Sequence, residues 1–405
     1  MRISSSSIYN TNVTSMDNLQ VQIANTMQQM STGQRILSPA DDPVGAARAT
    51  ELTLSNATNT QYTANCTAAT NTLSLAEGYL DSATSLLLDA QTTVSTANNP
   101  KLDDVSRKSM AADLQGKLND LLGLANSTDG AGTYLFSGSQ GNVKPFANTA
   151  SGVVYQGDDV QRKVQVAAAR QVSSSDSGSD IFMRIRNGNG IFQAAPVAAN
   201  TGTGIIDQGV VTNNPTAYNG DNYQVVFGAG GTTYSVTDTT TGLPVAGMTG
   251  VTYASGQAIS FGGIQLDIKG APAAGDTFNV TPSSNQSVFD TLNKLITTLN
   301  TPLSGATATV VAANTQALND GLAALNQDMN SVLGVRATMG SRLNELTSLQ
   351  STGDQIGLQL KSTLSTIQDT DYTKAATDLA QQKLALQAAQ QSFAQVSKLS
   401  LFNYL

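Results

Sequence analysis

Residues 16–47 have the sequence MDNLQVQIANTMQQMSTGQRILSPADDPVGAA. The first half of this stretch places apolar side chains at seven-residue intervals, a spacing that predicts a helix packed against another helix along one stripe. Met16, Ile23, Met30 and Leu37 lie seven residues apart, and Leu19 and Met27 fill the positions between them. The second half contains Asp42 followed by Pro43, an order that favours an N-cap and the first position of a new helix. The stretch therefore predicts a helical arm, a loop and the start of a second helix.

The C-terminal end of the chain carries a matching stripe. Its apolar positions are Leu379, Leu386 and Phe393, seven residues apart, with Ala389 and Val396 between them. We therefore expect the two ends to pair as a coiled coil. Two ordinary amphipathic core helices remain an alternative on the pattern alone.

Charge is almost missing from both arms. Residues 1–34 carry only Arg2 and Asp17, and residues 379–405 carry only Lys383 and Lys398. A solvated coiled coil usually keeps Glu and Lys beside its seam, whereas these arms carry Gln, Ser, Thr and Asn. This composition favours arms that become surrounded by other protein.

Glycine and proline divide the chain into helical ends and a β-rich middle. Of the 35 glycines, 24 lie between Gly130 and Gly275, and no proline precedes Pro39 or follows Pro302. Helix breakers confined to the middle predict an α+β protein. We expect an elongated antiparallel helical bundle or coiled coil built from both termini, with an inserted antiparallel β domain.

The expected domains follow from this division. Residues 1–44 and 355–405 form the terminal arms, residues 45–186 and 283–354 a helical rod with a β-hairpin, and residues 187–282 the inserted β domain. Outside the β domain we expect helices at about 43–97, 102–126, 288–299 and 315–350. A break at Gly353 leads into the final helix, which has an interruption near Asp369–Asp371.

Period-two alternation predicts the strands of the middle region. Val153 and Tyr155 are expected to form a hairpin with Arg162–Val166. A second hairpin joins Tyr223–Phe227 to Tyr234–Val236 through a glycine-rich turn, and further strands cover 264–268 and 277–280.

Composition argues against most catalytic chemistry. The 405 residues include no histidine and one cysteine, Cys66, so His-based triads, His-ligated metals and intramolecular disulfides are excluded. The Asp41/Asp42 pair and three similar acidic pairs lie at expected helix starts and turns, where Asp caps backbone N–H groups. We expect no enzyme activity, no cofactor and no metal site, with Cys66 as a packed side chain.

Charge and hydropathy limit the partners. The net charge is −8 and the charged fraction is 12%, against about 25% in a typical soluble protein. This balance argues against nucleic acid and anionic membranes. The N-terminus lacks the apolar core of a secretory signal and no long apolar run exists, so we expect neither a cleaved signal peptide nor membrane insertion.

Several motifs resemble the flagellin superfamily. Residues 30–47 are similar to the signature that follows its N-terminal arm, and the form SPADDP at 38–43 resembles the hook-associated branch, the hook–filament junction proteins, rather than filament flagellin. Further similarities are GTYLFSG at 132–138, VYQGD at 154–158, GVRATMGSRL at 334–343 and LSLFNYL at 399–405. The matches cover about 1–170 and 283–405, so the β insert is the part they describe least.

The resemblance implies a structural connector in the bacterial flagellum. A ring of copies would join the hook, through a neighbouring hook-associated protein, to flagellin on the filament side. The resemblance also implies extracellular placement at the hook–filament junction, type III export and a cytoplasmic chaperone at the C-terminal segment. The signature loop, with Pro39, Asp41, Asp42 and Pro43, would support subunit contacts.

Three functions stay open from the sequence: a junction protein, a filament flagellin, and a secreted enzyme or carbohydrate-binding module using the β insert. For the first, we expect an assembly interface in which the arm residues pack together, extended by the last apolar residues of the chain. This interface comprises Met16, Leu19, Ile23, Met27, Met30, Leu379, Leu386, Phe393, Val396, Leu399, Phe402 and Leu405.

Overall fold

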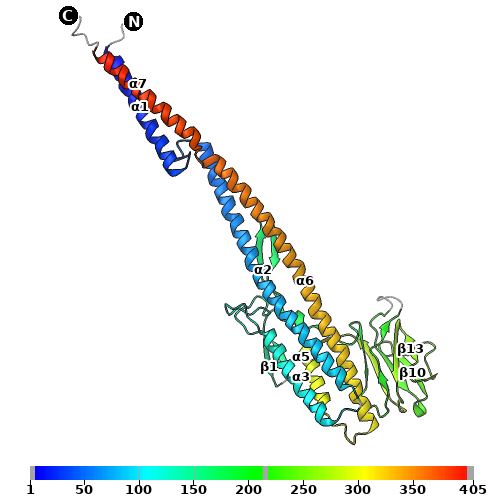
Figure 1. Ribbon diagram of the computed structural model, residues 1–405. Helices are drawn as coiled ribbons and strands as arrows, with labels where there is room; N and C mark the ends of the chain where they lie inside the picture. Colours follow the sequence, from blue (N-terminus) through cyan, green and yellow to red (C-terminus); the bar gives the residue numbers. More distant parts are fainter. Residues whose placement is uncertain (1–4, 100, 151, 213–217, 399–405) are drawn as a thin grey trace. The chain divides into compact units, whose positions relative to one another are not determined.

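The computed structural model describes residues 5–99, 101–150, 152–212 and 218–398. They form two compact units: a terminal unit, made of the chain up to Ala64 and from Ser348, and a central unit, Asn65–Thr347. The main helices are α1 Ser5–Thr32, α2 Pro43–Ala97, α3 Asp104–Ala125, α5 Val288–Asn300, α6 Ala308–Gln368 and α7 Tyr372–Lys398, with a short α4 at Gly178–Phe182 (Figure 1). The helical ends and β-rich middle predicted from glycine and proline are confirmed.

The strands belong to five antiparallel sheets in the central unit. The larger of the two main sheets has the order β11-β10-β9-β15-β6 with β12 on β10, and the smaller has β13-β14-β7 with β8 on β14. The larger sheet comprises β6 Phe192–Pro196, β9 Tyr223–Phe227, β10 Thr233–Asp238, β11 Leu243–Pro244, β12 Val251–Thr252 and β15 Thr277–Pro282. The smaller comprises β7 Ile205–Ile206, β8 Val210–Val211, β13 Ala258–Phe261 and β14 Ile264–Lys269. The remaining pairs are β1 Phe146–Thr149 with β2 Gly152–Tyr155, β3 Lys163–Ala167 with β4 Arg170–Ser173, and β5 Ile185–Arg186 with β16 Asn285–Gln286.

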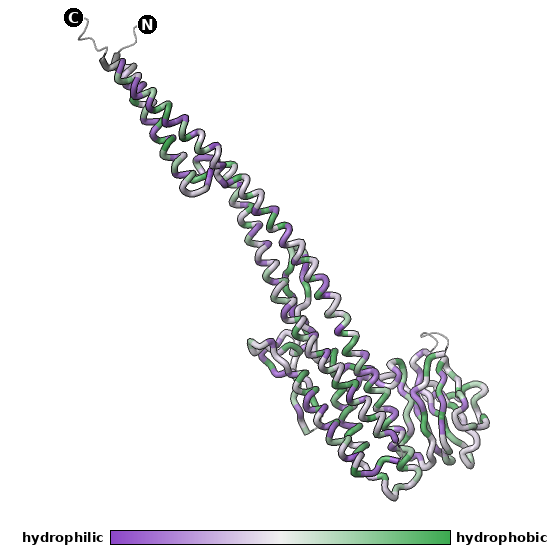
Figure 2. The backbone as a smooth tube through the Cα atoms, viewed as in Figure 1, coloured by the Kyte–Doolittle hydropathy of each residue, from purple (hydrophilic) through white to green (hydrophobic). Residues whose placement is uncertain are grey.

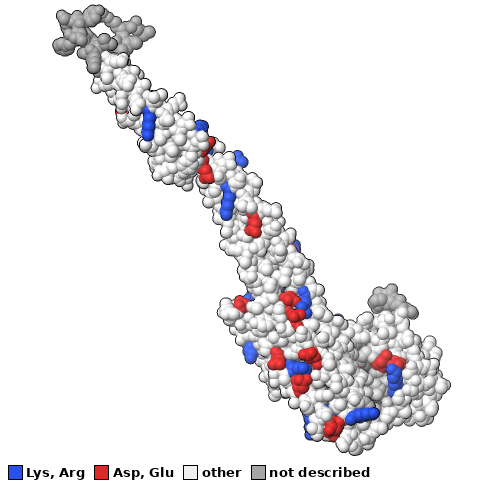
Figure 3. Space-filling model, viewed as in Figure 1, with Lys and Arg blue, Asp and Glu red and all other residues white. Residues whose placement is uncertain are grey.

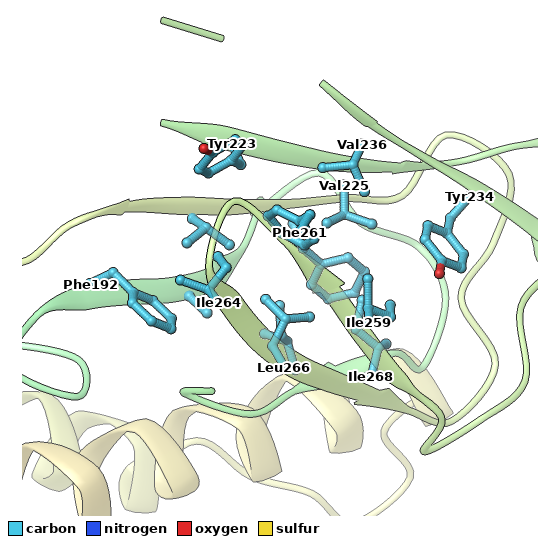
Figure 4. Close-up of a cluster of buried hydrophobic side chains, with 14 of the residues drawn as sticks. Phe192, Tyr223, Val225, Tyr234, Val236, Ile259, Phe261, Ile264, Leu266 and Ile268 are labelled. Carbon is cyan, nitrogen blue, oxygen red and sulfur yellow. The ribbon is translucent and has the colours of Figure 1, made fainter. Parts of the chain in front are cut away.

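The inserted β domain has its own hydrophobic core between the two larger sheets. Alternate residues of β9, β10, β14 and β15 are buried, which is the pattern of strands with one face on a core. Figure 4 shows Phe192, Tyr223, Val225, Phe261 and Leu266 pointing into this core from both sheets. The predicted β9–β10 hairpin is confirmed, because its register pairs Tyr234 with Phe227.

α2 and α6 pack along a seven-residue repeat within the central unit. The buried residues at seven-residue intervals include Leu73, Leu80, Leu87 and Val94 on α2, and Leu318, Leu325, Val332, Met339 and Leu346 on α6. Gln91 bonds Asn326 and Asn98 bonds Asn319, each at 2.9 Å, so the helices run antiparallel. A seven-residue seam of this kind is the geometry of a coiled coil. A search for apolar residues seven positions apart in 73–94 and 318–346 would have predicted this helix pair from the sequence.

Three sequence expectations about local structure are wrong. β2 pairs with the upstream β1 and β3 pairs with β4, so Val153 and Val164 do not share a hairpin. The connecting segment instead folds back over the 137–139 loop, where the Asp158 carboxylate accepts the backbone N–H of Ser139 at 2.6 Å. α6 also extends beyond the expected 315–350 and continues through Gly353 without a break.

Gly353 serves close helix packing rather than helix termination. It is buried in the terminal unit, and its carbonyl accepts the Asn59 side-chain amide at 2.7 Å. A Cβ at this position would lie 2.6 Å from Thr63 Cγ2, so glycine allows α2 to approach α6. The expected interruption near residues 369–371 is confirmed, since α6 ends at Gln368 and α7 begins at Tyr372.

Two glutamine side chains and one carboxylate attach the β domain to α6. Gln316 exchanges two hydrogen bonds with the backbone of Ile206, at 2.8 and 2.9 Å, and so acts as a strand partner for the free edge of β7. Gln208 does the same for Ala194 in β6, at longer distances of 3.2 and 3.4 Å. Asp320 Oδ1 accepts an N–H from each glutamine, at 2.8 and 2.7 Å. These contacts cover strand edges that would otherwise be unpaired.

Replacing Asp320 with asparagine is expected to remove part of the pH dependence of stability. Burial raises the pKa of Asp320 to about 6, against the opposing effect of its two hydrogen bonds. The folded state therefore keeps a proton on Asp320 that the unfolded chain releases near pH 4. The contribution of this protonated carboxyl to the free energy of unfolding is fully present below pH 4 and is lost as the pH rises through 6. The amide oxygen of the introduced asparagine can accept the same two N–H groups. We expect Asp320→Asn to unfold like the wild type at pH 4 and to be about 1–2 kcal/mol more stable at pH 8.

Urea denaturation followed by tyrosine fluorescence at pH 4, 6 and 8 would measure this difference. Burial also raises the pKa of Asp328, to about 8, so both proteins will lose stability over the same range. The difference in free energy of unfolding between variant and wild type therefore reports the contribution of Asp320 alone. A difference that does not change with pH would contradict the prediction.

Candidate assembly site

The two terminal arms pair with each other inside the terminal unit. α1 and α7 lie side by side in Figure 1. Three contacts along their length set their direction. The rings of Tyr9 and Phe393 are 5.1 Å apart, Thr26 Oγ1 is 3.1 Å from Gln382 Oε1, and the Thr370 N–H donates to the Gly33 carbonyl at 2.9 Å. Residue numbers rise on one helix as they fall on the other, so the pair is antiparallel.

Most of the predicted seam residues lie half-buried on one face of each arm. These residues are Met16, Leu19, Ile23 and Met30 on α1, with Leu379, Leu386 and Phe393 on α7. Met27 is different, because its side chain is 47% exposed while that of the adjacent Thr26 is only 7% exposed. The spacing explains this, since 16, 19, 23, 26 and 30 alternate by three and four residues, and position 27 falls beside the stripe. A prediction restricted to apolar residues therefore placed Met27 on the stripe instead of the adjacent Thr26.

Some predicted interface residues cannot be placed. Val396 lies in α7, but its side chain is outside the described residues. Leu399, Phe402 and Leu405 are also outside the described part of the chain. Their place in an assembly interface stays a prediction.

Apolar side chains also lie on the outer faces of the arm pair. Val21 and Leu384 are exposed, the latter by 69%, and Met27 joins them. Figure 3 shows few charged side chains over α1 and α7, and Figure 2 shows apolar residues distributed along both helices. Exposed apolar residues without charge between them are typical of surfaces that pack against other protein.

The signature loop ties α1 to the α6–α7 junction. Gly33 has φ of +71°, which glycine adopts without strain, and its carbonyl receives the Thr370 N–H. Gln34 and Asp369 form an antiparallel bridge. The Arg35 guanidinium donates to the Ile367 carbonyl at 2.8 Å, and so satisfies a C-terminal carbonyl of α6.

The two aspartates of the loop cap backbone N–H groups. Asp41 Oδ2 accepts the N–H of Ser38 at 2.7 Å and that of Leu37 at 3.1 Å, which closes a turn around the exposed Pro39. Asp42 Oδ1 accepts the Gly45 N–H at 2.8 Å. This bond, helped by Arg35 at 3.3 Å, lowers the pKa of Asp42.

Asp42 is therefore the N-cap of α2, and Pro43 is its first residue, as predicted. Gly45 is required by this cap, because a Cβ there would lie 2.4 Å from Asp42 Oδ2 and 2.8 Å from Ile36 Cδ1. The capping role expected for the Asp41/Asp42 pair is confirmed.

Two other sequence motifs come together in the central unit. Tyr155, from the 154–158 motif, donates its hydroxyl proton towards the carbonyls of Asp158, at 2.8 Å, and of Phe136 in the 132–138 motif, at 3.1 Å. Phe136 packs edge-on against Phe182, with ring centroids 5.8 Å apart. Further contacts with Phe146 and Phe289 complete an aromatic cluster. These motifs build the core of this region rather than a reactive site.

The 334–343 motif supplies two arginines that pair with distant carboxylates. Arg342 makes a bidentate pair with Asp176, at 2.8 and 2.9 Å, and both side chains are largely buried. Arg336 bonds Glu77 at 2.6 Å and Asp81 at 2.7 Å, linking α6 to α2. The spacing of the motif gave no indication of these partners, which lie more than a hundred residues away in sequence.

The described residues include no group of three or more Cys, Asp or Glu side chains placed to hold a metal ion. Cys66 is buried as expected, and burial raises the pKa of its thiol. Among the helices that the structure describes, none combines the length and the hydropathy required to span a membrane.

Comparison with known proteins gives consistent matches. The model of the bacterial flagellin N-terminal helical region matches residues 3–141. Flagellar hook-associated protein 3 of Salmonella typhimurium is 28% identical over 404 residues, which is 99% of both chains. The crystal structure of Xanthomonas campestris FlgL is 34% identical, with a TM-score of 0.71, and the match covers 76% of this chain and 98% of that one. The flagellar junction protein FlgL from Legionella pneumophila is 32% identical, with a TM-score of 0.70 and coverage of 80% and 100%.

Paired helical arms, a flagellin-type signature loop and an inserted β domain define a structural protein of the bacterial flagellum. Within that class, the full-length matches select the hook-associated proteins. The chain belongs to the FlgL family, the family of flagellar hook-associated protein 3.

Proposed function

We propose that this protein connects the flagellar hook to the flagellin filament and that it assembles through its paired terminal arms. The observation that carries the proposal is the α1–α7 pair, which has an apolar seam inside and uncharged, partly apolar faces outside. Such a pair retains surface for neighbouring copies after its own seam is formed. The similarity to hook-associated protein 3 over the whole chain supports the same function.

The proposed partners follow from this position. Copies of the chain form a ring, with another hook-associated protein on one side and flagellin on the other. The interface includes the seam residues of α1 and α7 and the signature loop with Pro39, Asp41, Asp42 and Pro43. Val396, Leu399, Phe402 and Leu405 extend it.

The same proposal covers biogenesis and chemistry. The protein reaches the junction outside the cell by type III export, and a cytoplasmic chaperone holds its C-terminal segment before export. It acts as a structural connector and not as an enzyme, and it needs no cofactor.

Deletion of the gene tests the proposal. Cells without the protein should build hooks but carry no filaments, and should release unassembled flagellin into the medium, because the first flagellin has no surface to bind. Electron microscopy and immunoblotting of the medium measure both effects, with the plasmid-borne gene as the control. Normal filaments on the deletion strain would contradict the proposal.

A further inference from the structure

The arms carry few of the charges that usually select coiled-coil partners. In a coiled coil, ion pairs beside the seam set which helices pair and in which orientation. Between residues 5 and 34 the only charged residue is Asp17, and α7 carries Lys374, Asp378, Lys383 and Lys398, so few ion pairs can form between the arms. In a ring of identical copies, each arm meets several other arms with similar apolar stripes. Partner choice must therefore come from another feature of the seam.

A polar contact interrupts the apolar seam between the arms. Thr26 is the most buried described side chain of α1, and its hydroxyl lies 2.9 Å from the Gln22 carbonyl and 3.1 Å from Gln382 Oε1. Gln382 is half-buried on the inner face of α7. A hydroxyl has a single proton for these two acceptors, but rotation of the Gln382 amide presents an N–H to the hydroxyl oxygen. Both groups can then be satisfied together.

We propose that the Thr26–Gln382 contact specifies which arms pair and in which register. A buried polar group costs free energy unless its partner is present, so any pairing that separates these two side chains is disfavoured. Two α1 arms from different copies, or an α1–α7 pair displaced by one heptad, would set Thr26 or Gln382 against apolar residues. A single buried polar position fixes register in other coiled coils by the same effect.

This inference is separate from the backbone contacts at the signature loop. The Gly33–Thr370 hydrogen bond holds only the inner ends of the arms. Thr26 lies roughly two helical turns farther along α1. Farther along the arms the seam holds apolar packing, including the Tyr9–Phe393 ring contact, and the Thr26–Gln382 contact. Apolar packing tolerates a change of partner, whereas a buried polar group loses its hydrogen bond.

The test compares the double variant Thr26→Val/Gln382→Leu with a matched double variant at exposed positions, Thr14→Val/Gln381→Leu. Both keep side-chain size, and the seam variant makes the stripe more apolar, so the arms should still pair. Spin labels at the exposed sites Asn18→Cys and Gln387→Cys report the pairing in the full-length protein. Cys66→Ser removes the native thiol, and its hydroxyl can donate to the Val166 carbonyl that Cys66 faces at 3.9 Å.

The wild-type sequence and the exposed-site control should each give one narrow distance peak by pulsed electron paramagnetic resonance. The seam variant should give several peaks, displaced by about 10 Å for each heptad of slip, or arising from pairs between copies. Unchanged helix content by circular dichroism shows that the arms remain folded. One unchanged peak in the seam variant would overturn the inference.

Swimming assays separate this inference from the proposed function on which its biological meaning rests. Loss of the unique register together with loss of filaments supports both. Loss of the register with normal filaments supports the inference and contradicts assembly through the arms. Loss of filaments with an unchanged register overturns the inference.

Discussion

Leu386→Asp is expected to abolish filament attachment and swimming. Leu386 lies half-buried in the middle of the predicted seam on α7, opposite α1. The facing helix offers no cation to a carboxylate there, because the described α1 carries only Asp17 as a charged residue. Burying an unpaired charge is strongly unfavourable, so the arms separate or the neighbouring copies cannot pack against them. Complementation of the deletion strain should leave cells with hooks and no filaments.

The adjacent Gln387→Asp is the matched control, because Gln387 is exposed and receives the same charge. It should support swimming at near wild-type rates. The central unit of Leu386→Asp should unfold at the wild-type urea concentration, followed by tyrosine fluorescence. Normal filaments in Leu386→Asp would show that the α1–α7 seam is not needed for assembly.

Arg342→Met is expected to destabilise the central unit by about 3–5 kcal/mol, because it leaves a buried carboxylate without its cation. The side chain of Asp176 is 7% exposed and that of Arg342 is 16% exposed, and the two form a bidentate pair. Gln161 also donates to Asp176 at 2.8 Å, but a neutral amide does not neutralise the charge. Urea denaturation at pH 7 measures the effect as a lower midpoint.

Two further variants show whether the unpaired charge is the cause. Arg170→Met removes an exposed ion pair with Glu345 and should cost less than about 1 kcal/mol. Arg342→Met/Asp176→Asn removes both charges of the buried pair and should recover most of the lost stability. Equal destabilisation by Arg342→Met and Arg170→Met would contradict the argument.

Local patterns predicted the helices and the β9–β10 hairpin, because their partners are close in sequence or share a visible period. The stop at Asn98 and the start at Pro43 follow from side chains within a few residues of each helix end. The hairpin pairs two strands across a glycine-rich turn. The same reasoning failed for β2, because its true partner β1 has no clear alternation and lies upstream.

The half-buried face of the arm pair was predicted in part for a similar reason. A count of apolar residues found Met16, Ile23 and Leu386, but it included Met27 and missed Thr26. Spacing by three and four residues places Thr26 on the stripe, so strict heptad positions would have found it. Nothing local connects Arg342 to Asp176, because their contact exists only after the chain has folded.

The most direct test of the central claim is immunogold labelling of intact flagella with an antibody against residues 187–282, the inserted β domain. If the protein connects hook and filament, gold particles should form one band where the hook meets the filament. Gold along the whole filament would identify a filament subunit instead, and would contradict the connector function.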